Sequence, residues 1–470
     1  MASANGNNEL HVRVVSRRLV KASDTSTTPH VLAVSNLDLI PQSMPISMFC
    51  IYPRPPTGDF TAIIAAFETG LPSLLNHFFP FAGRIATNPS SGVPEFHCNN
   101  QGAELLVGEA SAALASLDYA TVTASVRRVQ QPYADGVALS VQVVSFECGG
   151  FAVAWCTNHV LADGKALSLL VSAWSELART GALSAGARPN HDRSMFRPRA
   201  PPSYSDSFNK AFTPVHAERQ VNVLTAEQSF VERLYYIEAP DIDRLREAAS
   251  RDGAQRATRV QAVAAYIWKA LAGVVGAADT RCRMEWWVDG RPRLTTKLDP
   301  ELHGAMRNYI GNVTTFAIRE ASVDDLQRMA LTDVAAIVRE AITAPAYDEH
   351  FQELVDWVED HKTERHIETA SLGLGSPTVS VSAFTSFPLD TDFGFGSAAM
   401  AMPTTTSTVR LCGGFVQMAA RPGGDGSWIT SAFLWPRLAA ALESDEPCIF
   451  KPVTAEYLGL SASQVSRSRL

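Results

Sequence analysis

Residues 140–179 read SVQVVSFECGGFAVAWCTNHVLADGKALSLLVSAWSELAR, a segment in which two strand patterns are followed by a helix pattern. Residues 140–146 and 151–156 are rich in β-branched and aromatic side chains. Between them, residues 147–150 contain two glycines that permit a tight turn. The pattern predicts a β-hairpin whose second strand leads directly to His159.

A helix is predicted directly after this hairpin. From 165 to 179 apolar residues recur at helical spacing, and Gly181 follows as a typical helix end. Residues 159–164, HVLADG, therefore form a strand-to-helix turn. Such a turn exposes its histidine, the side chain best poised to accept a proton near neutral pH. Taken alone, a histidine is more often a packed residue, and zinc would need ligands that no Cys or His spacing supplies.

The composition is that of a globular protein. The chain has 470 residues, 46% hydrophobic and 19% charged, which predicts two or three domains. A net charge of −8 without an extended basic patch argues against nucleic acid as a partner. The seven cysteines form no CxxC pair, which predicts free thiols and no metal site. Residues 260–278 contain Gln261 and Lys269, so they predict a buried helix and not a membrane span.

Breaks in the apolar pattern divide the chain. Several prolines among charged and serine residues after 181 predict a linker, placed at 186–225, between an N-terminal domain, 1–185, and a C-terminal domain, 226–470. Strand and helix patterns alternate in both halves, which predicts two α/β domains. The other predicted strands are 12–19, 231–237 and 285–288. The other predicted helices are 60–79, interrupted at Gly70-Leu71-Pro72, one from Asp241 to about Gly253, and 259–274.

Five short segments occur in the order and at the approximate spacing of a known family. They are 79–84 (FPFAGR), 159–164 (HVLADG), 288–294 (VDGRPRL), 308–312 (NYIGN) and 392–396 (DFGFG). Together they resemble the signature of the BAHD acyltransferases, plant enzymes that move an acyl group from a coenzyme A thioester to an alcohol or amine. The resemblance covers most of the chain.

The resemblance implies a fold and a reaction. The fold would be α/β, with two chloramphenicol-acetyltransferase-like domains and a substrate channel between them. His159 would be the general base of a direct transfer without an acyl-enzyme, and Asp163 would support the motif by pairing with one of two arginines, Arg291 or Arg293. Acyl-CoA would be a co-substrate, with no bound cofactor and no metal, and the protein would be a monomer.

Further residues have an implied structural role. Gly164 would permit the tight backbone of the first motif, and Asp392 would support the domain arrangement outside the reaction centre. The full set with an implied structural role is Gly164, Arg291, Arg293, Asp392, Gly394 and Gly396.

The oxyanion that forms at the thioester carbonyl needs a hydrogen-bond donor. The family often has Ser or Thr two residues before a Trp, ahead of its second motif. Here Ser382 and Phe384 resemble that pair, so Ser382 is the candidate donor. Shikimate-using relatives carry an arginine where this chain has Ser386, which disfavours a carboxylated acceptor. Phe384 and Ser386 are therefore candidates for the substrate pocket, although a shorter spacing before Asp392 leaves an alternative alignment open.

The chain ends in Ser468-Arg469-Leu470, close to the Ser-Lys-Leu address that a peroxisomal import receptor reads. This ending predicts a peroxisomal location, with the cytoplasm as the alternative. Because peroxisomes generate benzoyl-CoA, the resemblance then implies benzoyl transfer to a small alcohol such as benzyl alcohol. One alternative is a hydroxycinnamoyl-CoA transferase acting on another alcohol or an aliphatic amine. Another is a family member that binds acyl-CoA without turnover.

Overall fold

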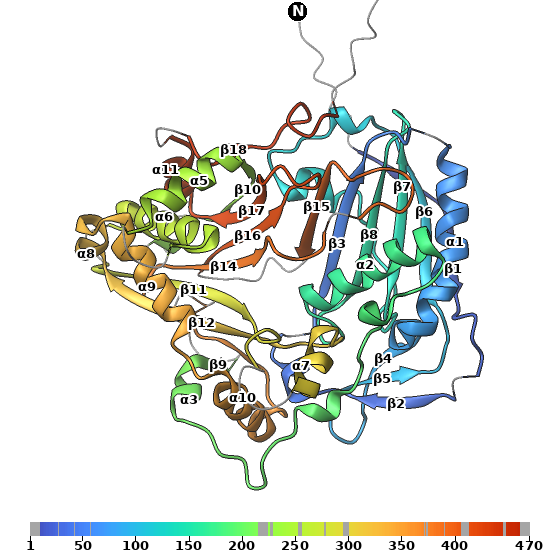
Figure 1. The fold of residues 1–470 in the computed structure, drawn as a ribbon, viewed down its shortest axis with the longest axis horizontal. Coiled ribbons are helices and arrows are strands. Elements are labelled where there is room, and N and C mark those ends of the chain that lie inside the picture. Colours follow the sequence, from blue (N-terminus) through green and yellow to red (C-terminus); the bar gives the residue numbers. More distant parts are fainter. Residues whose placement is uncertain are drawn as a thin grey trace, which may run out of the picture.

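The computed structural model gives the chain two large β-sheets with helices packed against each (Figure 1). It describes residues 10–26, 28–41, 43–56, 58–214, 224–225, 229–251, 256–276, 279–294, 300–370, 372, 375–389, 391–405, 413–444 and 448–460. The Ser468-Arg469-Leu470 ending, on which the peroxisomal prediction depends, lies outside the described residues.

The first sheet has six strands. In spatial order they are β1 (Val12–Val20), β6 (Ala103–Ala110), β7 (Ser140–Phe146), β8 (Phe151–Asn158), β3 (Pro45–Tyr52) and β15 (Met400–Thr405). The predicted hairpin is confirmed as β7 and β8, which pair antiparallel with Ser140 opposite Cys156. Alternation along β8 sends Trp155 to one face of the sheet and Cys156 to the other. Cys156 also stands opposite Ser47 of β3.

Helices α1 (Phe60–His77) and α2 (Gly164–Thr180) cover one face of this sheet (Figure 1). Phe67 of α1 contacts Trp174 of α2 edge-on, with ring centroids 5.0 Å apart. Phe67 also lies 6.4 Å from the ring of Trp155, measured between centroids. The two helices and the strand that leads to His159 therefore share one hydrophobic core.

The predicted interruption of the first helix is wrong. Helix α1 continues through Pro72, the residue that was expected to break it. A proline inside a helix removes one backbone hydrogen bond. Leu71 and Leu74, on either side of Pro72, are completely buried, and this packing outweighs the lost bond.

The second sheet has seven strands and its own hydrophobic core. In spatial order they are β12 (Thr314–Ser322), β11 (Arg281–Asp289), β14 (Thr378–Phe384), β16 (Gly414–Ala420), β17 (Trp428–Leu434), β10 (Val231–Ile237) and β18 (Lys451–Pro452). The strand predicted at 231–237 is confirmed as β10. The strand predicted at 285–288 is the inner part of the longer β11.

Helices α6, α8, α9 and α11 pack against strands of the second sheet, and smaller elements complete the fold. Among the described residues of the second half, the helices are α5 (Ala239–Ala248), α6 (Arg259–Val274), α7 (Pro300–Arg307), α8 (Val323–Arg328), α9 (Leu331–Thr343), α10 (Tyr347–His361) and α11 (Pro436–Ser444), with α3 (Ser207–Ala211) before them. The small sheets contain β2 (His30–Ala33), β5 (Pro94–Cys98) and β4 (Arg84–Thr87), and β13 (His366–Glu368) and β9 (Phe212–Pro214). The helix predicted at 259–274 is confirmed as α6. The helix predicted from Asp241 begins two residues earlier, because Pro240 fits its first turn.

Strand β15 belongs to the second half of the chain but lies in the first sheet. It runs antiparallel to β3, from Met400 opposite Ile51 to Thr405 opposite Ile46 (Figure 1). No pattern in the sequence predicts that residues 400–405 pair with the first sheet. Because of it, the second half of the chain supplies the edge of the first sheet.

Within the described residues, no helix combines the length and the apolar composition that crossing a membrane requires. Helix α6, which covers most of the apolar stretch 260–278, is instead buried against the second sheet, with Ala264 and Trp268 completely inaccessible.

Candidate active site

His159 lies in the turn between β8 and α2. Its backbone N–H donates to the carbonyl oxygen of Met44 at 2.8 Å, which holds the turn against the start of β3. Its ring atom Nδ1 lies 3.0 Å from Oδ1 of Asn312. The histidine predicted from the strand-to-helix pattern therefore contacts a residue of the second half of the chain.

The Asp163 carboxylate binds backbone N–H groups and an arginine. Its Oδ1 accepts from the N–H of Ala166 at 2.8 Å and so caps the N-terminus of α2. Its two oxygens accept from Arg291 at 2.8 and 3.0 Å, a bidentate pair. Its Oδ2 also accepts from the N–H of Val313 at 3.0 Å. Asp163 thus joins the turn after β8 to two segments of the second half.

Arg291 is the arginine that pairs with Asp163. It is 4% exposed and also donates to the carbonyl oxygens of Tyr309 and Gly311. Burial alone would lower the pKa of Arg291, but the charges of Asp163 and Asp289 outweigh that effect and raise it above its ordinary value.

Arg293, the other predicted partner of Asp163, lies elsewhere. Its guanidinium donates to the carbonyl oxygen of Asp289 at 2.7 Å and lies over the ring of Tyr347. Arg293 therefore supports the turn that follows β11, next to the segment that carries Arg291.

Two further buried charged residues, Asp38 and Arg193, lie close to the turn that carries His159. Asp38, in a short helix over Asn36–Leu39, is 0% exposed and pairs with Nε of Arg193 at 2.9 Å. Arg193, in the predicted linker, also donates to the carbonyl oxygen of Leu161 at 2.9 Å. Ser35, which caps the short helix with Asp38, was a local signal for that turn, but no sequence pattern indicated Arg193.

Gly164 begins α2 where the ring of Phe384 approaches from β14. A Cβ atom at position 164 would stand 2.3 Å from Cε1 of Phe384, far inside van der Waals contact. Ser382 lies two residues before Phe384 on the same strand, so both side chains leave the same face of the sheet. Ser386 follows the end of β14 and is exposed.

The second motif, residues 392–396, forms a loop held by its own hydrogen bonds and packs on the helical face of the first sheet. Asp392 Oδ1 accepts from the backbone N–H groups of Gly394 at 2.7 Å and Gly396 at 3.0 Å. Both glycines have φ of 95°, a conformation open to glycine. Phe393 stacks on Trp155 with centroids 5.6 Å apart, and the hydroxyl of Ser175 donates to the Asp392 carbonyl oxygen. Through these contacts the motif connects the second half of the chain to the hydrophobic core between β8 and helix α2.

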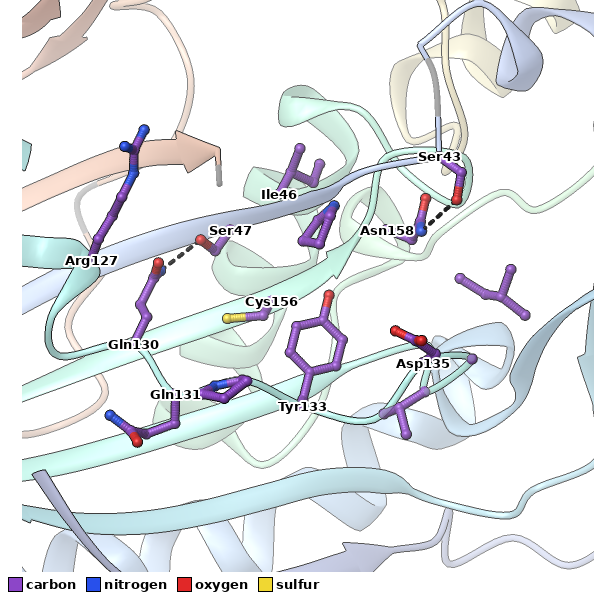
Figure 2. Close-up of a pocket in the computed structure, with 15 residues that line it drawn as sticks. Ser43, Ile46, Ser47, Arg127, Gln130, Gln131, Tyr133, Asp135, Cys156 and Asn158 are labelled. Atoms are coloured by element: carbon purple, nitrogen blue, oxygen red, sulfur yellow. Dashed lines mark hydrogen bonds between the residues drawn. The ribbon is translucent and has the colours of Figure 1, made fainter. Parts of the chain in front are cut away.

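A cavity of about 440 Å³ opens beside the first motif (Figure 2). Its lining includes Asn158, the residue before His159, and Pro45, which follows the Met44 that accepts from the His159 N–H, but neither His159 nor Ser382, Phe384 or Ser386 is among its lining residues. Its lining is mixed: Ile46, Ile85 and Val137 are apolar, whereas the side-chain amide of Asn158 donates to Ser43 at 2.9 Å and that of Gln130 donates to Ser47 at 2.6 Å.

The cavity also carries two charged groups. Arg127 is already paired with Glu232 at 3.7 Å. Asp135 is exposed at the edge of the cavity. In the described part of the chain, no three or more His, Cys, Asp or Glu side chains gather so that they could hold a metal ion.

Two β-sheets with helices packed on them, a strand of the second half at the edge of the first sheet, and a turn that carries His159 and the buried Asp163 are the features that a two-domain acyltransferase would have. The sequence model of the family described as "Transferase family" matches residues 10–445, so the chain belongs to this family, the BAHD acyltransferases. The chain is therefore an acyltransferase that uses acyl-CoA as co-substrate.

Relatives named for acyl transfer match large parts of the chain. Putrescine hydroxycinnamoyltransferase of Oryza sativa subsp. japonica is 28% identical over 89% of this chain and 95% of its own length. Anthranilate N-benzoyltransferase protein 1 of Dianthus caryophyllus is 28% identical over 60% of this chain and 63% of its own.

Solved structures show the same fold. Vinorine synthase matches with a TM-score of 0.64 and 21% identity over 96% of this chain and 98% of its own. TRI101 of F. graminearum, complexed with coenzyme A and deoxynivalenol, matches with a TM-score of 0.73 and 15% identity over 90% of this chain and 99% of its own. The predicted fold class is confirmed.

Proposed function

We propose that this enzyme transfers an aromatic acyl group from coenzyme A to a small amine or alcohol, with His159 as the general base. The observation that carries the proposal is the position of His159, which contacts Asn312 of the second half and directly follows Asn158, a residue that lines the cavity. The aromatic acyl group is supported by the relatives, which are named for hydroxycinnamoyl and benzoyl transfer.

The reaction would proceed by direct attack. His159 takes the proton from the acceptor N–H or O–H as that atom bonds to the thioester carbonyl carbon. The carbonyl oxygen becomes an oxyanion, to which the Ser382 hydroxyl would donate. When the intermediate collapses, the C–S bond breaks and protonated His159 returns the proton to the coenzyme A sulfur.

The charge at the cavity favours an amine with a second cationic end. The amine that attacks the thioester must be neutral. A second, distal ammonium or guanidinium on the same acceptor molecule would keep its charge. Asp135 offers a carboxylate at the cavity edge for that distal group, whereas Arg127 is already paired with Glu232. Relatives named putrescine hydroxycinnamoyltransferase and agmatine hydroxycinnamoyltransferase support the same class of acceptor.

Benzoyl transfer to benzyl alcohol is the second candidate. It is favoured by the Ser468-Arg469-Leu470 ending and by Ser386 in place of an arginine. The ending is tested with an N-terminal fluorescent fusion in plant cells. Loss of a punctate peroxisomal signal on deletion of the tripeptide would support the peroxisomal proposal, and diffuse signal from both fusions would refute it.

A mass-spectrometric product screen tests the reaction. Benzoyl-, coumaroyl-, acetyl- and malonyl-CoA are each offered with benzyl alcohol, putrescine, agmatine and shikimate. A coumaroyl amide as the main product supports the first candidate, and benzyl benzoate supports the second. His159→Ala should abolish turnover with an unchanged melting temperature. Full activity in that variant would refute the general base, and no product from the wild type would favour the non-catalytic alternative.

Asp135→Asn tests the acceptor site. Losing one exposed charge contact should raise KM for putrescine or agmatine by about two- to fivefold, with KM for benzyl alcohol unchanged. Glu147→Gln is the matched control, since Glu147 is an exposed carboxylate in the turn between β7 and β8, at the opposite end of the hairpin from Asn158. Equal KM values for putrescine in the two variants would contradict a role for Asp135.

A further inference from the structure

A row of three polar side chains crosses the second sheet (Figure 1). Ser382 of β14 is the register partner of Gln417 of β16, and Gln417 is the register partner of Ser431 of β17. Register partners on neighbouring strands point their side chains to the same face of a sheet. The three side chains therefore lie side by side on one face.

The hydrophobic residues next to this row show which face it occupies. Val416 and Met418, on either side of Gln417, are buried in the core between the second sheet and its helices. Alternation along β16 then sends Gln417 to the opposite face. Ala419, on the same face as Gln417, is buried in the hydrophobic core that contains the first sheet. The row thus faces the first half of the chain.

The turn that carries His159 lies close by on the same face. The ring of Phe384, two residues after Ser382 on β14, lies against Gly164 at the end of that turn. Two residues of a strand span roughly 7 Å. Ser382 and Gln417 are both partly exposed, so a bound molecule can reach them.

The hydrogen bonds of the row leave two donors available. The Ser431 hydroxyl donates to Oε1 of Gln417 at 3.2 Å, so the amide oxygen is turned toward β17. The NH₂ group of Gln417 is then on the side of Ser382. Among the described residues, neither this NH₂ group nor the Ser382 hydroxyl has a hydrogen-bond partner. Both groups can donate, so one oxygen atom placed between them would accept from both.

We infer that Gln417 is a second donor to the oxyanion, acting together with Ser382. As the acceptor atom bonds to the thioester carbonyl carbon, the π electrons of the C=O bond move onto its oxygen, and the acceptor's proton passes to His159. The negative oxygen accepts from the NH₂ group of Gln417 and from the hydroxyl of Ser382. When the electrons return, the C–S bond breaks and the proton passes to the sulfur. The inference rests on the direct transfer of the proposed function, but not on the identity of the acyl group or acceptor.

Gln417→Met keeps the length of the side chain and removes the donor. The kcat should fall by at least about thirtyfold, with KM for acyl-CoA within about twofold, because the donor acts only once the oxyanion forms. The loss should be equal for coumaroyl-CoA and acetyl-CoA, since both give the same oxyanion. Gln327→Met is the matched control, because the Gln327 amide donates to the Ala272 carbonyl oxygen among the helices of the second half. That variant should keep the wild-type kcat.

Gln417→Glu separates a contact with the oxyanion from a structural role. At pH 8 the new carboxylate has the shape of the amide but repels a negative oxygen, so kcat should fall further than in Gln417→Met. Both variants should keep the wild-type melting temperature. Ser431→Ala releases the amide oxygen and lets the amide turn over, so it should lower kcat less than Gln417→Met does. A kcat that falls only in step with the melting temperature would refute the inference.

The choice of acyl donor provides a second way to overturn the inference. A clearly larger loss with coumaroyl-CoA than with acetyl-CoA in Gln417→Met would place Gln417 against the acyl chain and not at the carbonyl oxygen. An unchanged kcat with both donors would equally refute the assignment.

A trifluoromethyl ketone attached to coenzyme A separates this inference from the proposed function. Its hydrate is a tetrahedral analogue of the intermediate, and calorimetry measures its binding without turnover. Gln417→Met should weaken binding of the ketone by at least about tenfold and leave binding of coenzyme A unchanged. If the wild type transfers no acyl group yet Gln417→Met weakens only the ketone, the proposed function fails and the assignment of Gln417 stands. Equal binding of the ketone to both proteins would refute the assignment.

Discussion

Asp163→Asn removes one negative charge and keeps the shape of the side chain. Asparagine can still cap α2, so the change isolates the pair with Arg291. The new NH₂ must face N–H donors of Arg291 or Val313, and the buried Arg291 is left with Asp289 as its remaining anion. We expect the free energy of unfolding to fall by about 3 kcal/mol, with lower kcat/KM. Denaturant titration and steady-state kinetics measure both.

Asp289→Asn is the control for that prediction. Asp289 also accepts from Arg291, at 3.1 Å, but it is only partly buried. Its loss should cost less than half as much free energy as the loss of Asp163. An Asp163→Asn enzyme with the wild-type melting temperature would contradict the structural role of this residue.

At the scale of elements, the loop 392–396 depends on one carboxylate. Asp392→Ala leaves the N–H groups of Gly394 and Gly396 without their acceptor, and both glycines have positive φ. We expect a loss of about 1–2 kcal/mol in the free energy of unfolding, with KM for acyl-CoA unchanged. Thermal unfolding and kinetics report the two quantities. Ser175→Ala, which removes one bond to the same loop, should cost less.

Elements with a strong local period could be predicted, and elements that depend on distant partners could not. Helix α6 and strand β10 match their predicted bounds because their apolar periodicity is complete within each segment. Strand β15 has no such signal. Its pairing with β3 is decided by residues some hundreds of positions away, which local periodicity does not record.

The candidate site divides in the same way. His159, Asp163 and Arg291 each stand in a recognisable segment, and the structure brings the three together. Asp38 and Arg193 are 155 positions apart in the chain, and Asp38 is 274 positions from Asn312. Asp38, Arg193 and Asn312 come into contact only when distant segments pack together, so no spacing in the sequence could indicate their roles.

At the scale of the whole molecule, the first sheet should not fold without the second half. A fragment of residues 1–185 lacks β15, so β3 becomes an edge strand whose residues, such as Phe49 and Ile51, are otherwise buried. It also lacks Phe393, which covers Trp155. An exposed apolar edge strand promotes aggregation. We therefore expect the fragment to aggregate or to unfold without cooperativity in calorimetry, whereas the full chain should show one transition. A soluble fragment with a sharp unfolding transition would show that residues 1–185 fold as an independent domain. Strand β15 would then not be required for the first sheet to fold.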